Sequence, residues 1–387
     1  MAVITLQDEM ALQIAAWQLG QLRFDLTEQS DGNGHTATRL VAPPRWRLRM
    51  GSVPALVAAD AARWKATALS LRGRINHLAM WDITNPAPRG TARGVQTLAS
   101  TAAAGATALT ISGAKTANNL LAAGSAVTAA AWNVMTATPT INTHVAPDGT
   151  TTADTLDDPS AVVARYVRQT INVPNDSASY QYSCYVRKTT GGTAPTFCMA
   201  FLFQGGGTVA GAYLRLNTDT GAVIFGAGTV SDAGAYWLFN GVLANNSTGH
   251  TTANFELYPA WAPYGVTTQD PTTTGSAVVW GSNVQPASGA TDYTPTTYLA
   301  GDMLQIGSGV GSHYAMVTAA AAENDAGQIV VSIEPPLRQA ISSGAAVTWD
   351  KPVAHYKLTG DSQAWQGVPG SSDVGGFAFD LLEDWRA

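Results

Sequence analysis

The sequence has few charged residues. Asp, Glu, Lys and Arg make up only 12% of its 387 residues, about half the share that is typical of soluble proteins. Its polar surface must therefore come largely from Thr, Ser, Asn and backbone groups, as in β-rich proteins that assemble or present large surfaces. The formal net charge of −6 provides no basic field for phosphates, which argues against sequence-independent binding of nucleic acid.

Cysteines and long apolar runs are also scarce. The two cysteines, Cys184 and Cys198, lie in neighbouring apolar alternations, without a C-x-x-C motif or a histidine at ligand spacing. We expect buried free thiols and no zinc site. No stretch approaches 18 uninterrupted apolar residues, so no membrane-spanning helix is expected. The first ten residues carry Asp8 and Glu9 and no basic residue before an apolar run, which does not match a signal peptide.

Catalytic motifs are missing as well. The sequence contains no P-loop, no G-x-S-x-G, no H-E-x-x-H and no dinucleotide-binding G-x-G-x-x-G. The nearest approach to a glycosidase dyad is the pairs Asp157 with Asp158 and Glu383 with Asp384. Adjacent residues on a strand point to opposite faces, so solvated turns explain these pairs better. The six histidines are scattered without pairing. We predict no enzymatic activity, no metal site and no cofactor.

The N-terminal part mixes strands with one helix. Residues 45–50 alternate basic and apolar side chains, which predicts a strand with one buried face. Residues 53–71 place apolar side chains three and four apart, which predicts an amphipathic helix that Gly73 ends. Residues 75–83 read as a further strand.

The rest of the sequence predicts nested β-domains. Residues 107–112 resemble a strand that should be followed by a turn and a second strand, but this continuation appears only at residues 299–307. A structureless loop that spans the residues between them is uncommon in compact domains, so we expect a complete domain to be inserted there. The intervening segment contains many short strand-like runs between turns, which favours a two-sheet sandwich. The predicted fold is therefore mainly β: an outer domain (1–94 with 350–387), a small β-domain (95–117 with 298–349) and an inserted β-sandwich (118–297).

The inserted sandwich is similar to the galactose-binding-like jelly-roll modules, of the carbohydrate-binding type, that many phage tail proteins carry. The family's usual Gly-Trp-Tyr-Arg strand is replaced here by Ala-Tyr-Trp-Leu at 235–238. The segments that carry the resemblance are 119–121, 131–132, 146–156, 180–186, 217–223, 279–285 and 291–297.

The flanking parts resemble the distal-tail or tail-tip structural proteins of siphophages, on residues 79–91, 299–307, 331–338 and 347–352. This resemblance implies a homo-oligomeric ring, a hexamer, located in the virion between the tail tube and the tip. The implied partners are other copies of the chain, the neighbouring tail tube and hub proteins, and a host-surface saccharide. The protein would be made in the cytoplasm of the bacterial host.

Four aromatic residues of the insertion are the candidate saccharide ligands: Trp261, Tyr264, Tyr258 and Trp132. Aromatic rings offer flat apolar faces to the C–H groups of a pyranose, and Pro259 with Pro263 could prevent a regular strand and expose the Trp261 ring. Two alternatives stay open from the sequence. One is a tail fibre or receptor-binding protein, and the other is a carbohydrate-binding accessory protein of a secreted glycosidase.

Overall fold

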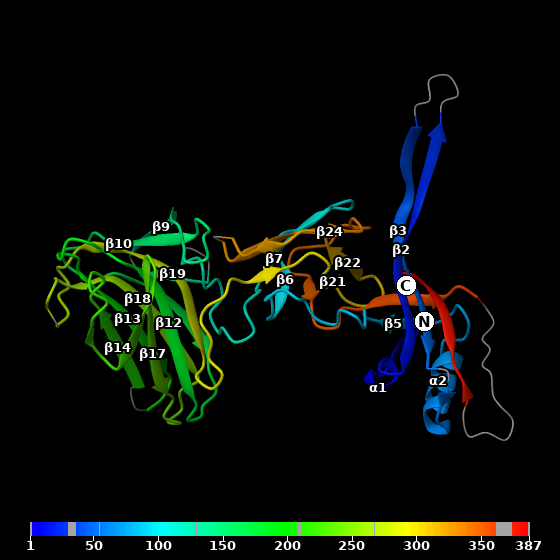
Figure 1. Ribbon diagram of the computed structural model, residues 1–387, viewed down its shortest axis with the longest axis horizontal. Coiled ribbons are helices and arrows are strands. Elements are labelled where there is room, and N and C mark those ends of the chain that lie inside the picture. Colours follow the sequence, from blue (N-terminus) through cyan, green and yellow to red (C-terminus); the bar gives the residue numbers. More distant parts are fainter. Residues whose placement is uncertain are drawn as a thin grey trace.

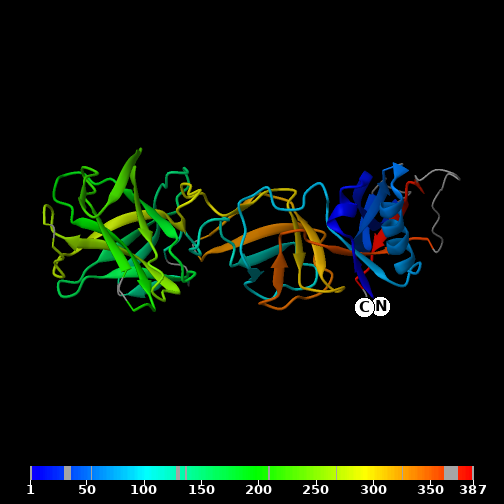
Figure 2. The same ribbon diagram turned by 90° about the horizontal axis from the view of Figure 1, so that it is seen from below.

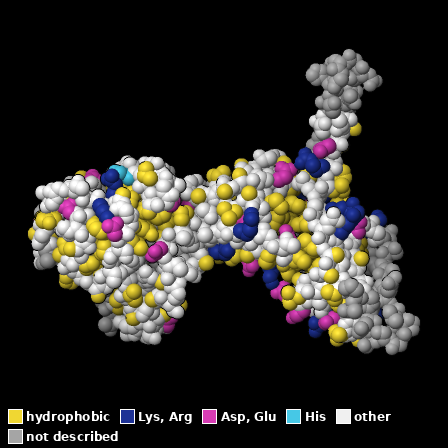
Figure 3. All heavy atoms as spheres, in the orientation of Figure 1, with side chains coloured by type: hydrophobic (Ala, Val, Ile, Leu, Met, Phe, Trp, Pro, Cys, Tyr) yellow, Lys and Arg dark blue, Asp and Glu magenta, His cyan; other side chains and the backbone are white. Residues whose placement is uncertain are grey.

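The protein is elongated, and its regular elements are nearly all strands, with a sheet at one end, a barrel in the middle and a sandwich at the other end (Figures 1 and 2). Strands account for 49% of the chain and helices for 5%, so the predicted mainly-β fold class is confirmed. The surface in Figure 3 is mostly uncharged, in agreement with the composition. The computed structural model describes residues 2–29, 36–53, 55–127, 131–135, 137–207, 210–266, 268–324, 326–360 and 374–385.

The outer sheet contains strands from both ends of the chain, in the order β1-β5-β26-β28-β3-β2. Its core side is covered by helix α2, whose Trp64 ring stacks on Phe377 and lies 5.8 Å from the ring of Phe379. The strands are β1 (Val3–Thr5), β2 (Ile14–Gln29), β3 (Thr36–Ser52), β5 (His77–Met80), β26 (Ala354–Leu358) and β28 (Ala378–Glu383), with a separate pair, β4 (Ala55–Leu56) and β27 (Val374–Gly375).

The predicted helix is present but shorter than expected. Helix α2 runs over Ala58–Ser70 and buries Ala61, Trp64 and Ala68 along one stripe. It does not begin at residue 53, because Ala55 and Leu56 pair with β27 instead. A second helix, α1 (Asp8–Ala11), was not predicted.

Strands β2 and β3 form a long hairpin that projects from the outer sheet (Figure 1). Strand β28 pairs with β3 only along residues 47–51, so the outer part of β3 has β2 as its sole neighbour in the described chain. Pro43 and Pro44 lie in this outer part, beside register shifts near Phe24. A proline has no N–H to donate, and it is tolerated where the neighbouring strand is missing or bulged.

The middle of the molecule is a closed six-stranded barrel in the order β21-β22-β24-β7-β6-β25. Its interior is filled by aliphatic side chains such as Ile111, Leu304 and Val331, all fully buried. The barrel strands are β6 (Gln96–Leu98), β7 (Ala108–Ser112), β21 (Met303–Ile306), β22 (His313–Val317), β24 (Gln328–Glu334) and β25 (Ala346–Thr348), and β20 (Thr297–Tyr298) pairs with β23 (Ala321–Ala322) beside them.

Buried polar contacts join the barrel to the outer sheet. Arg338 forms a salt bridge of 2.6 Å with Glu383, and their side chains are 4% and 2% exposed. The second Glu383 oxygen accepts a hydrogen bond from the Trp46 backbone N–H, and the Trp46 indole donates to the carbonyl of Tyr314. Glu383 therefore does not lie in a solvated turn as expected from the sequence, because Arg338 compensates its charge inside the structure.

The sandwich consists of two six-stranded antiparallel sheets that enclose one aromatic and aliphatic core. One sheet has the order β16-β17-β12-β19-β10-β9 and the other β15-β14-β13-β18-β11-β8. The strands are β8 (Asn133–Met135), β9 (Thr138–His144), β10 (Ala153–Asp158), β11 (Tyr166–Asn172), β12 (Ser179–Arg187), β13 (Thr196–Gln204), β14 (Ala210–Leu216), β15 (Val223–Phe225), β16 (Gly228–Ala233), β17 (Tyr236–Ala244), β18 (Thr252–Ala262) and β19 (Gly275–Pro286).

Two predictions about the burial of titratable side chains can be compared with the structure of the sandwich. Cys184 and Cys198 are free and buried, as predicted, and burial raises the pKa of the Cys184 thiol to about 12. Asp158, in contrast, is not in a solvated turn. It is fully buried at the end of β10, where its carboxylate accepts hydrogen bonds from the backbone N–H groups of Ser160 and Arg165.

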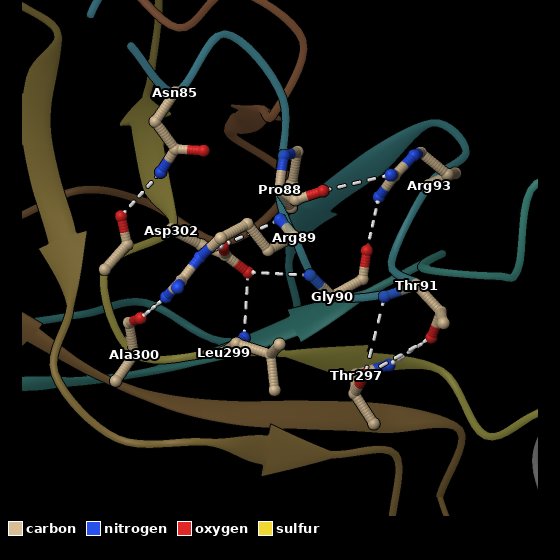
Figure 4. Close-up of polar contacts among 11 residues, drawn as sticks. Asn85, Pro88, Arg89, Gly90, Thr91, Arg93, Thr297, Leu299, Ala300 and Asp302 are labelled. Atoms are coloured by element: carbon tan, nitrogen blue, oxygen red, sulfur yellow. Dashed lines mark hydrogen bonds and ion pairs between the residues drawn. The ribbon is translucent and has the colours of Figure 1, made fainter.

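The segment that leads from the outer sheet into the barrel lies beside the segment that returns from the sandwich. Asp302 is fully buried, and its carboxylate accepts backbone hydrogen bonds from Arg89 at 2.8 Å, Gly90 at 3.3 Å and Leu299 at 2.8 Å (Figure 4). The Thr297 N–H also donates to the Thr91 hydroxyl. These contacts tie the segment that leads into the barrel to the segment that returns from the sandwich. The exact domain boundaries stay a prediction.

Candidate binding face on the sandwich

One outer surface of the sandwich carries an unusual layer of aromatic and charged side chains, which we call the aromatic face. It lies on the sheet that contains β11, β13, β14, β15 and β18. Residues of these strands alternate, so Phe201, Leu214 and Phe255 point into the core while their neighbours point outward. The members of the aromatic face are Tyr166, Arg168, Tyr213, Arg215, Phe225, Glu256, Tyr258 and Trp261.

A β-bulge places Trp261 in this layer. Thr196 of β13 is opposite Ala262 and Cys198 is opposite Tyr258, so residues 259–261 of β18 lie opposite a single residue of β13. Strict alternation would put Trp261 and Tyr258 on opposite faces, but the bulge brings their ring centroids to 4.9 Å. Pro259 fits the bulge because the ladder does not require its missing N–H there.

The expectation that Pro259 and Pro263 expose the Trp261 ring is wrong. Strand β18 continues through Pro259 to Ala262, and Trp261 is only 5% exposed. Its ring packs against Tyr258 and Tyr213, with the Arg215 guanidinium 5.0 Å above it. Trp261 therefore forms the base of the aromatic face, and its indole N–H has no hydrogen-bond partner.

A buried carboxylate orders the charged part of the aromatic face. Glu256 is 1% exposed and accepts hydrogen bonds from Arg168 Nε at 2.7 Å and from the Tyr258 hydroxyl at 2.6 Å. Arg168 also donates to the Tyr166 hydroxyl at 3.0 Å. Burial, together with the hydrogen bond to Glu256, raises the pKa of Tyr258. The Glu256 carboxylate therefore fixes the positions of the Arg168 and Tyr258 side chains through these hydrogen bonds.

Partly exposed rings and guanidinium groups form the accessible layer. Tyr166 and Tyr213 are partly exposed, and Phe225 is 50% exposed. The Arg215 guanidinium lies 4.2 Å from the centre of the Phe225 ring, so it spans Phe225 and Trp261. The Arg168 side chain is 28% exposed. Aromatic surfaces and fixed hydrogen-bond donors therefore lie next to each other on one sheet.

The structure separates the four residues that the sequence proposed as saccharide ligands. Tyr258 and Trp261 meet in the aromatic face. Trp132 lies in the sandwich core, 4% exposed, where its indole donates to the Ala123 carbonyl at 3.1 Å and its ring packs edge-on against Phe255. Tyr264 lies just beyond β18 and is 45% exposed. Trp132 is therefore placed where no surface ligand can reach it.

The remaining members of the aromatic face were not found from the sequence. A Tyr-x-Arg pattern occurs at Tyr166 with Arg168 and at Tyr213 with Arg215, but also at Tyr185 with Arg187 on β12 of the other sheet, so the pattern alone does not single out this face. Which strands lie next to each other could not be derived from the pattern either.

The chemistry of the aromatic face suits binding better than catalysis. Glu256 is the only carboxylate among its members, and its oxygens already accept hydrogen bonds from Arg168 and Tyr258. A glycosidase needs two carboxyl groups at a defined separation. Within the described residues, no group of three or more His, Cys, Asp or Glu could hold a metal ion, and no helix is long and apolar enough to cross a membrane.

Comparisons with known proteins give little further information. No protein family and no curated protein matches the chain. Among solved structures, the chain is similar to the enzymatically active domain of tailspike protein 4 from bacteriophage CBA120, with a TM-score of 0.30 and 14% sequence identity. The match covers 43% of this chain and 21% of the tailspike chain.

Proposed function

We propose that this protein is a structural component of a bacteriophage tail tip, and that its sandwich binds saccharide on the host surface through the aromatic face. The observation that carries the saccharide part is the layer of Tyr166, Tyr213 and Phe225 beside Arg168 and Arg215. Partly exposed rings stack on the apolar faces of sugars, and guanidinium groups donate hydrogen bonds to their hydroxyl or carboxylate groups. Trp261 and Glu256 support this layer from below.

The test is saccharide binding by the full chain, measured on a glycan array and on host cells. Tyr213→Ala should weaken binding about tenfold, which corresponds to the loss of about 1.4 kcal/mol of stacking. Arg215→Ala should weaken it further by removing the donor above Phe225 and Trp261. Tyr264→Ala should have a smaller effect, because Tyr264 lies beyond the end of β18 and is not a member of the aromatic face.

Val242→Ala is the matched control. Val242 is 58% exposed on β17, in the other sheet of the sandwich, so its loss should leave binding unchanged. Equal losses for Val242→Ala and Tyr213→Ala would contradict the assignment of the aromatic face. If the wild-type protein binds neither glycans nor host cells, the saccharide part of the proposal is wrong and the sandwich has only a structural role.

The outer sheet supports the assembly part of the proposal. Strands β1 and β2 are its two edges, and unpaired edges readily add strands from another chain. The projecting hairpin exposes Leu22, Leu26 and Val41, which are 36%, 40% and 64% exposed. Two different edges that meet head to tail generate a closed ring if the rotation closes. The resemblance of the flanking parts to siphophage distal-tail proteins favours a ring of six.

Mass photometry at micromolar concentration tests this assembly. We expect a single closed oligomer, and Leu26→Asp should dissociate it by placing a charge on the hairpin. Leu69→Asp on α2, where Leu69 is 63% exposed, is the control and should leave the oligomer intact. A monomer at every concentration, alone and with the neighbouring tail proteins, would contradict the ring. Immunogold labelling of virions would distinguish a tail-tip ring from a tail fibre.

A further inference from the structure

A buried carboxyl group lies at the junction between the barrel and the sandwich. Glu323 follows β23 and is 9% exposed, and its backbone N–H donates to the carbonyl of Thr296 at 3.0 Å. On the sandwich side it faces the segment around Ala123 and Ser125. This segment belongs firmly to the sandwich, because Ser282 N–H donates to the Gly124 carbonyl at 2.7 Å.

The Glu323 carboxyl lacks the partners that a buried charge requires. The hydroxyl groups of Thr296 and Ser125 and the backbone N–H of Ala123 face it, but neither carboxyl oxygen has a partner in full hydrogen-bonding geometry. Asp302 at the same junction differs, since it accepts three backbone hydrogen bonds. An ionised carboxylate without a cation or full hydrogen bonding is costly inside a protein.

The other titratable group that faces Glu323 cannot compensate its charge. Tyr293 is 5% exposed, its hydroxyl has no partner in hydrogen-bonding geometry, and it shares the Ser125 side chain with Glu323. Asp148 adds further negative charge near Tyr293. No Lys, Arg or His contributes to the pKa of Glu323, which burial raises to about 7.

The sandwich segment that faces Glu323 is held in place by tight packing within the sandwich. A Cβ atom at Gly124 would lie 2.5 Å from the Ser282 carbonyl oxygen and 2.6 Å from the Tyr293 ring. The Tyr293 ring itself packs edge-on against Trp280 at 5.0 Å. Both Glu323 carboxyl oxygens are buried, so their hydration requires the barrel side, which carries Glu323, to move away from this fixed segment of the sandwich.

We propose that Glu323 is a pH-sensitive latch between the barrel and the sandwich: its uncharged carboxyl keeps the junction closed, and its ionisation loosens the junction and frees the sandwich to move. The latch operates on rising pH, because the charged form is the one that the closed junction cannot accommodate. It is independent of whether the aromatic face binds saccharide.

Distance measurements between spin labels on the full chain test the latch. Labels at Val242→Cys on the sandwich and Val330→Cys on the barrel occupy positions that are 58% and 51% exposed, and the native thiols are buried. The wild-type background should give a narrow distance distribution at pH 5.5 and a broad one at pH 8.5. Glu323→Gln should stay narrow at both pH values, and the control Glu334→Gln should behave as wild type.

A distribution that does not change with pH in the wild-type background would overturn the proposal, as would Glu323→Gln that broadens like wild type. If Glu323→Gln does not fold, the same distance measurement on the Ser125→Ala variant tests the proposal instead. The Ser125 hydroxyl lowers the pKa of Glu323, so its removal should shift the midpoint of broadening to higher pH. An unchanged or lower midpoint would refute the latch.

Discussion

Trp132 and Trp261 are buried to nearly the same extent, 4% and 5% exposed, but their indole N–H groups differ. That of Trp132 donates to the Ala123 carbonyl at 3.1 Å, whereas that of Trp261 has no partner. Replacement of each by Phe removes about 40 Å² of buried ring surface, which costs about 1 kcal/mol. The hydrogen bond then decides which variant loses more stability.

Trp132→Phe removes the indole hydrogen bond to the Ala123 carbonyl, which keeps the Ala126 N–H as a donor at 3.3 Å. Loss of this one hydrogen bond costs about a further 0.5–1.5 kcal/mol. Trp261→Phe instead removes a buried, unpaired N–H, and this relief offsets most of the lost packing. We expect Trp132→Phe to lower the local free energy of unfolding by about 1.5–2.5 kcal/mol and Trp261→Phe by roughly 1 kcal/mol or less.

Native-state hydrogen exchange of the slowest amides in β13 and β18 measures this local free energy in the full chain. A single global free energy of unfolding is not used, because the outer sheet, the barrel and the sandwich need not unfold together in one two-state transition. Equal losses for the two variants would refute the reasoning from the indole N–H groups. A larger loss for Trp261→Phe would mean that Trp261 packs more tightly than its surroundings suggest.

Three further predictions concern buried polar groups. Glu383→Gln should destabilise the joint unfolding of barrel and outer sheet by about 3–5 kcal/mol, since it leaves Arg338 buried without a counter-charge; an unchanged calorimetric transition would contradict this. Cys184 and Cys198 should not react with a thiol reagent at pH 8 until the chain is denatured, because burial raises both pKa values; rapid labelling of native protein would contradict their burial. Since the folded-state pKa of Glu323 is raised from 4.5 to about 7, its contribution to stability is full below about pH 4.5 and is lost by about pH 7. Wild type should therefore lose about 3 kcal/mol relative to Glu323→Gln across that range, and parallel pH profiles of the two melting temperatures would exclude it.

Strands with one buried face could be predicted from the sequence, and strands with two solvated faces could not. Residues 45–50 of β3 alternate strictly and bury Trp46, Leu48 and Met50 while the arginines between them are not buried, so their alternation identified the strand. Strand β9 has no buried residue, and the outer half of β2 leaves Leu22 and Leu26 exposed. Such strands are held by backbone pairing with a neighbour, which leaves no period in the side chains.

The aromatic face could be predicted only in part for a related reason. The sequence singled out Tyr258 and Trp261 because prolines flank them, but the position of Trp261 depends on a bulge against β13. Bulges are set by the register of two strands far apart in sequence, which local patterns do not contain. Glu256 was not recognised either, because its role depends on Arg168 in the adjacent strand β11.

The order of strands in the outer sheet has a consequence for how the protein is synthesised. Strands β26 and β28 lie between β5 and β3, so the middle of this sheet is missing until residues 354–383 have left the ribosome. The sandwich strands emerge earlier and can fold first, since domains generally fold as units during synthesis. A chain that terminates prematurely would keep β3 and β5 apart and could not form the sheet whose edges we propose for assembly. Translation of the last strands would then act as a checkpoint that admits only finished subunits to the proposed assembly.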